Sequence, residues 1–288
     1  MTSLPQSPVR DLLRELQGVL RATGISPKVG SPADQEIRAF LRPVSVKTAL
    51  SQANTALAAS ADHLEALDRL VGEAQYAIAP WTCARGVLEA TAIATWLLDS
   101  KIDTKERVSR SLALRFSTLQ EQRKMANAIG DHQNVQAIDE RIESIEAMAI
   151  QLGYSPLRDS RGRRSGIGQV KSSITDLVQQ QFDFGNLYRV LSGVAHSDSA
   201  VISQLGFMKT GPLTLHGVVA ERAVPKEIQR MLLANAVAIY TRDVWLRVVQ
   251  YGCDAAETAV ILEKRYDQLD LADTDAVRFW RSTVRQGS

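Results

Sequence analysis

The segment of residues 81–98 constrains the fold more than any other part of the sequence. When it is wound as a helix, apolar side chains cover its circumference, and only Arg85 and Glu89 interrupt them with charge. Such a helix needs neighbours on every side, because an exposed face would leave apolar surface in water. Its charges and limited length argue against a bilayer crossing. We therefore expect a helical core that surrounds this segment, and no membrane contact.

Helical periodicity extends through most of the remaining chain. In residues 8–23, apolar side chains fall on one stripe and charged ones fall opposite. Ser31 and Asp103 are helix-start signals, the latter with Glu106 three residues later. Pro43 is expected to end or kink the helix that starts at Ser31. Helices are expected at residues 8–23, 31–43, 44–75, 81–98, 103–129, 131–152, 170–180, 185–196, 225–250, 254–266 and 273–285.

Strand signal is confined to residues 207–219, where a small hairpin would turn at Gly211 and Pro212. The expected fold class is therefore all-α, a helical bundle or orthogonal helix array with at most this one hairpin. We expect residues 1–30 to form an N-terminal helix and linker, and residues 31–288 to form a single helical domain.

Residues 153–168 are expected to form a flexible Arg/Gly loop. Between residues 153 and 171 there are five basic residues and one acidic residue. This loop is the best anion-binding candidate outside the helices, and a solvated connector is the alternative. Its arginines are Arg158, Arg161, Arg163 and Arg164.

Composition excludes several classes of function. The 288 residues include 34 Lys and Arg against 32 Asp and Glu, a net charge of +2, so no chain-wide attraction to nucleic acid or membrane is expected. Cys83 and Cys253 lie far apart in no metal-like spacing, which fits a reducing compartment. The N-terminus lacks the features of a secretory signal, so a cytoplasmic location is expected. HExxH, CxxC, GxxxxGK[ST] and GxSxG motifs are absent, and we expect no metal or cofactor.

One constellation could carry chemistry. Arg189 and His196 are seven positions apart, so on a helix they face within about 20° of each other and lie about 10.5 Å apart along the axis. Ser192 and Gly193 fall on the same stripe, and apolar residues cover the opposite half. This pattern predicts an Arg, a Ser and a His aligned along a groove or interface.

The Arg-x6-His spacing resembles the motif of HEPN-type proteins, many of which are all-helical, metal-independent endoribonucleases. The resemblance implies that Arg189 binds the scissile phosphate and that His196 transfers protons when the RNA 2′-hydroxyl attacks it. It also implies a homodimer, RNA as a partner, and a toxin or defence role with a protein regulator. Where the family often has a polar residue after the Arg, this chain has Val190. The helix 81–98 and the Arg/His segment also look like those of uncharacterised bacterial helical proteins.

Other interpretations of these residues stay open. His196 could instead cap its helix, with Tyr188, Ser192 and His196 in one hydrogen-bonded row. Arg85 and Glu89 could line the cleft that faces Arg189 and His196, or could form a self-satisfied buried pair. The chain could accordingly be a helical protein–protein interaction module, or a small-ligand binder with a pocket lined by the helix 81–98.

Overall fold

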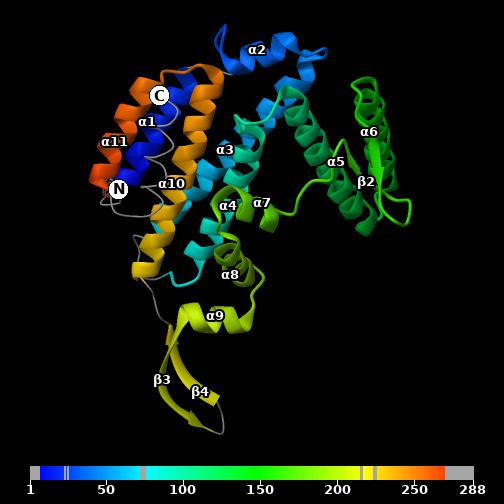
Figure 1. The fold of residues 1–288 in the computed structure, drawn as a ribbon. Helices are drawn as coiled ribbons and strands as arrows, with labels where there is room; N and C mark the ends of the chain where they lie inside the picture. The colour runs from blue at the N-terminus through cyan, green and yellow to red at the C-terminus, as the bar shows by residue number, and fades with distance from the viewer. Residues whose placement is uncertain are drawn as a thin grey trace.

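The computed structural model describes residues 7–22, 24, 26–71, 76–214, 217–222 and 226–269, and these residues confirm the all-α class (Figure 1). The helices are α1 (Pro8–Ala22), α2 (Pro32–Ala39), α3 (Pro43–Val71), α4 (Ala79–Leu98), α5 (Thr104–Ala128), α6 (His132–Gln151), α7 (Ile174–Phe182), α8 (Gly185–Ala195), α9 (Ser199–Gly206), α10 (Lys226–Tyr251) and α11 (Ala255–Gln268). The strands are β1 (Pro156–Arg158), β2 (Arg164–Ile167), β3 (Phe207–Thr214) and β4 (Gly217–Arg222).

Helix α4 lies at the centre of the array, as its apolar sequence predicts. It packs against α3, α10, α7, α8 and α5, so neighbours cover it on several sides. Trp81 and Trp96 are both buried in this core. These two side chains therefore fill the interior, and neither lines the cavity or the groove described below.

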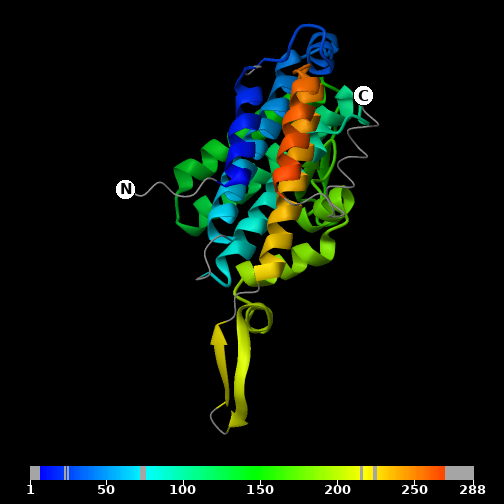
Figure 2. The same ribbon diagram turned by 90° about the vertical axis from the view of Figure 1, so that its left-hand side faces the viewer.

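The N-terminal helix belongs to the same core. Helix α1 packs against α3, α10 and α11, and its apolar stripe is buried with theirs (Figure 2). Near the end of α11, Arg265 donates from Nε to Glu15 of α1 over 3.0 Å and also pairs with Asp11. Residues 7–22 thus pack with the chain that follows.

Helix starts follow the local signals in the sequence. The side chains of Ser31, Asp103 and Asp131 each accept a backbone N–H in the first turn of α2, α5 and α6. The expectation for Pro43 needs correction, because α2 already ends at Ala39 and Pro43 opens α3 instead. Proline suits a first helical position, where no N–H partner is needed.

Two short antiparallel ribbons interrupt the helices. The segment 153–168, expected to be a flexible loop, contains the paired strands β1 and β2. The hairpin expected near 207–219 is present as β3 and β4, but β3 continues through Gly211 and Pro212 instead of turning there. The pairing register shifts between Lys209 and Leu213, an irregularity that tolerates the missing N–H of Pro212. Figures 1 and 2 show this second ribbon projecting from the helical body beside α9.

The helix expected at 273–285 lies outside the described residues. None of the helices within the described ranges combines the length and the apolar character needed to cross a membrane.

Candidate functional site

Helix α8 presents one buried face and one open face. Tyr188, Leu191 and Val194 are buried, and α8 packs against α4 and α7. This matches the apolar half that the sequence placed there, except that Val190 is 37% exposed. The opposite face is left to solvent and to α9.

Arg189 and His196 lie on the open face. Both side chains are exposed, and neither makes a hydrogen bond or an ion pair with any described residue. Ser192 between them is half-buried. At Gly193 a Cβ atom would stand 2.9 Å from Val201, so the missing side chain is what lets α9 approach α8. The structure therefore forms the helix that aligns the stripe, and both side chains stay without a polar partner among the described residues.

His196 occupies the C-cap position of α8. Its backbone N–H donates to the carbonyl of Ser192 over 3.0 Å, while its imidazole donates to no carbonyl of the described residues. Tyr188 does not join a row with Ser192 and His196, because its hydroxyl donates elsewhere. His196 thus occupies the position that the capping interpretation expects, but its imidazole does not make the expected hydrogen bond to a described carbonyl.

Arg85 and Glu89 reach α8 through Tyr188. Arg85 donates from Nε to Glu89 Oε1 over 2.7 Å, and the Tyr188 hydroxyl donates to the same oxygen over 2.7 Å. The Arg85 guanidinium also lies over the Tyr188 ring. Burial and the Glu89 carboxylate raise the pKa of Tyr188. These contacts make Arg85 and Glu89 a pair that joins α4 to α8, with no contact to Arg189 or His196 among the described residues.

Glu89 also lines a groove of about 900 Å³ between α3, α4 and α5. His63, Glu121 and Lys171 line it as well. Burial lowers the pKa of Lys171, while Glu89 and Glu121 act in the opposite direction. The sequence did not connect these residues, because they come from four separate segments.

Most arginines of the segment 153–168 already bind other groups of the protein. Arg163 pairs with Asp159 over 2.8 Å, Arg164 pairs with Glu146 over 3.3 Å, and Arg158 donates to the carbonyl of Gly162. Only the Arg161 side chain has no partner among the described residues. The ribbon packs against α5 and α6, whereas α8 packs against α4, α7 and α9. The structure therefore does not bring these arginines to the Arg/His stripe.

Two buried charged residues on α10 were not singled out from the sequence. Asp243 is fully buried and Arg247 is 3% exposed. The signal was available, since both interrupt an apolar stretch of a helix, as Arg85 does in α4. Burial raises the pKa of Asp243 well above its ordinary value, although Thr95 donates a hydrogen bond to it.

Comparison of the chain with models of protein families, with curated proteins and with solved structures found no match. Within the described ranges, no group of three or more His, Cys, Asp and Glu residues is placed to hold a metal ion.

Proposed function

We propose that this protein is a HEPN-like, metal-independent RNA-cleaving protein with Arg189 and His196 as its catalytic residues. The observation that carries the proposal is that both side chains are exposed on one face of α8 and make no polar contact with a described residue. A guanidinium without an acidic partner can take a phosphate through its planar pair of N–H donors. An imidazole without a fixed partner can act first as a general base and then as a general acid.

The reaction needs only these two kinds of group. His196 takes the proton of the RNA 2′-hydroxyl, whose oxygen attacks the adjacent phosphorus. The P–O5′ bond breaks, and the leaving oxygen takes a proton from an imidazolium. Arg189 stabilises the charge that builds on the phosphate oxygens. The products are a 2′,3′-cyclic phosphate and a 5′-hydroxyl end.

A homodimer would complete the site. Along one helix the two residues are about 10.5 Å apart, a long span for one phosphate. A second copy that faces the first would place its own Arg189 and His196 beside them, so that one imidazole accepts a proton while the other donates. Exposed Val190 lies next to Arg189 and offers an apolar contact for that copy. The toxin or defence role, the protein regulator and the cytoplasmic setting extend this proposal by resemblance.

The test is incubation of the purified protein with a mixed tRNA and mRNA pool in the presence of EDTA. Wild type is compared with His196→Ala, Arg189→Met and the matched control His132→Ala, which removes an exposed imidazole from the start of α6. We expect wild type and His132→Ala to leave 2′,3′-cyclic phosphate ends. Loss of the catalytic imidazole should lower the cleavage rate by about 100-fold or more.

Two outcomes would overturn the proposal. One is a wild-type protein that cleaves no RNA of the pool. The other is cleavage that His196→Ala and Arg189→Met leave unchanged, which would assign the activity to another site or to a contaminant. Circular dichroism of each variant shows that a lost activity is not a lost fold.

A further inference from the structure

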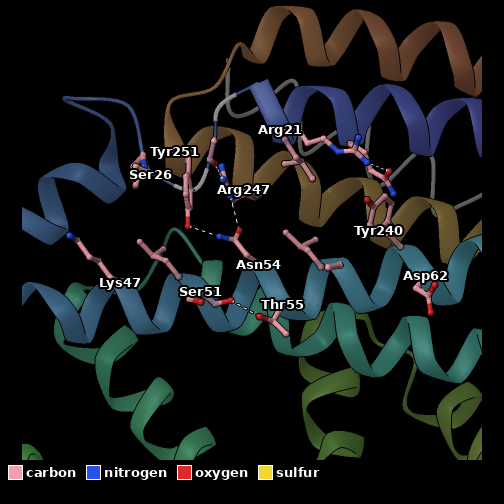
Figure 3. A pocket seen from close by; sticks show the side chains of 18 of the residues that line it. Arg21, Ser26, Lys47, Ser51, Asn54, Thr55, Asp62, Tyr240, Arg247 and Tyr251 are labelled. Carbon is pink, nitrogen blue, oxygen red and sulfur yellow. Dashed lines mark hydrogen bonds between the residues drawn. The ribbon is translucent and has the colours of Figure 1, made fainter.

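A cavity of about 980 Å³ opens between α1, α3 and the C-terminal half of α10 (Figure 3). Its floor contains apolar side chains, among them Leu50 and Leu57 of α3 and Leu20 of α1. It lies in a different part of the fold from the Arg/His stripe, since α8 contributes no residue to its lining. Nothing in the proposed RNA cleavage uses it.

A buried cation that pairs with no acid of the described residues lies in the wall of this cavity. Arg247 is 3% exposed, and its guanidinium donates to Asn54 Oδ1 over 2.8 Å, to the carbonyl of Gly24 over 3.3 Å and to Cys253 Sγ over 3.6 Å. It also stacks on the ring of Tyr251. All of these partners are uncharged, and no carboxylate of the described residues pairs with it.

Arg107, another buried arginine of the core, differs from Arg247 in having an acidic partner. Arg107 is 1% exposed and donates to both carboxylate oxygens of Glu36, over 2.8 and 3.0 Å. A buried charge is costly unless an opposite charge compensates it. Arg107 has that compensation from Glu36, whereas no described acid compensates Arg247. Burial accordingly lowers the pKa of Arg247.

Further polar groups collect at the same end of the cavity. Asn54 Nδ2 donates to the Tyr251 hydroxyl oxygen over 2.8 Å, which leaves the hydroxyl hydrogen available to another acceptor. Lys47, which is exposed, lies at this end in Figure 3. Asp62 lies at the opposite end, eight residues along α3 from Asn54, or about 12 Å along the helix axis.

We propose that this cavity binds a small amphipathic carboxylate. The carboxylate group lies against Arg247 and Tyr251, at the end of the cavity where Lys47 also lies, and supplies a counter-charge that no described carboxylate provides. The apolar body follows α3 over Leu57 toward Asp62. Away from Arg247 and Lys47, the charged residues that line the cavity are Arg21, Asp62 and Glu65, a net charge of −1 that disfavours a second carboxylate. The cavity therefore takes a monocarboxylate in preference to a dicarboxylate of the same length.

The test is calorimetric titration of the full chain with octanoate at pH 7 and fixed ionic strength. Octanedioate, 1-octanol and octylammonium serve as probes with the same chain and different ends. We expect octanoate to bind at least about tenfold more tightly than each of the other three. 1-Octanol carries no charge to pair with Arg247, octylammonium carries a charge that Arg247 repels, and octanedioate places a second carboxylate near Asp62.

Two variants locate the bound molecule. Asn54→Asp keeps the shape of the side chain and places a carboxylate on Arg247, so octanoate affinity should fall by about tenfold or more. Ala58→Trp fills the cavity from an exposed position on α3 and should abolish binding. The matched control Ala59→Trp is also exposed but faces the groove on the other side of α3, and it should bind like wild type.

The proposal is overturned if octanoate at millimolar concentration gives no saturable heat with the folded protein. Equal affinity for octanoate and octylammonium would overturn it as well, since the charge of Arg247 would then play no part. Binding that survives both Asn54→Asp and Ala58→Trp would place the ligand elsewhere.

Discussion

The open face of α8 and the cavity wall of α10 each hold an arginine that pairs with no described acid. Arg189 is exposed, so water solvates its charge and the lack of a partner costs almost nothing. Arg247 is 3% exposed, so the same lack costs free energy of folding unless a ligand restores the missing charge. The more deeply an unpaired charge is buried, the more strongly it indicates a missing partner or ligand. Exposed Arg189 is stable without a ligand, whereas buried Arg247 gains free energy when an anion binds beside it.

The difference arises from the position of the two helices. Helix α10 packs against α4, α3, α11, α2 and α1, so residues on most of its faces are enclosed. Helix α8 packs against α4, α7 and α9 and keeps one side free. Substitutions in the two regions test this contrast.

The largest effect is expected from Asn54→Asp. A carboxylate 2.8 Å from Arg247 Nε should raise the free energy of unfolding at pH 7 by about 2 kcal/mol, because it compensates a buried charge. The folded-state pKa of this new acid would be depressed, so the gain is present above the unfolded pKa and is lost as pH falls toward about 3. Urea unfolding at both pH values measures it.

The same substitution on the open face is the control for that prediction. Asn186→Asp places an acid three residues before Arg189 on exposed α8, and it should gain at most about 1 kcal/mol from the pair and the helix end. In about 1 M NaCl this gain should disappear while that of Asn54→Asp persists. Equal gains with equal salt dependence would contradict the distinction between the two regions.

A second buried charge gives the next effect. Burial raises the pKa of Asp243, so the folded chain holds a proton that the unfolded chain has already lost, and stability falls as pH rises above the unfolded pKa. Asp243→Asn should therefore stabilise the protein by about 1–2 kcal/mol at pH 7, because an uncharged amide of the same shape avoids the cost of burying this acid. Thermal unfolding at pH 3 should show no difference from wild type. A loss of stability at pH 7 would contradict this account.

A smaller effect is expected from Tyr188→Phe. The change removes the hydroxyl that donates to Glu89 Oε1 and leaves the ring in place under Arg85. We expect a loss of about 1 kcal/mol in the free energy of unfolding, measured by urea titration. Because Glu89 contacts neither Arg189 nor His196, RNA cleavage should keep its rate, and a large drop would place this cluster in the site.

The smallest effect on stability is expected from His196→Ala. Its imidazole bonds to no described residue, so the change should alter the free energy of unfolding by less than about 0.5 kcal/mol in a urea titration. A loss of about 1 kcal/mol or more would instead favour the capping interpretation, in which the imidazole complements the helix end.

Much of the fold could be predicted from local sequence. The starts of α2 and α5 follow from Ser31 and Asp103, because a cap is satisfied within one turn of its own helix. The central place of α4 follows from its apolar circumference. The β1–β2 ribbon could not be predicted, because it forms against a distant helix. At Gly168, for example, a Cβ atom would stand 2.6 Å from Ser109 Oγ of α5.

The candidate sites divide in the same way. The alignment of Arg189 with His196 is a property of helical periodicity, so the sequence by itself determined it. Their exposure, the link from Tyr188 to Glu89, and the enclosure of Arg247 beside Asn54 were decided only by the tertiary structure. The physical reason is that capping and periodicity act over a few neighbouring residues. Burial and charge compensation depend on which distant segments pack together.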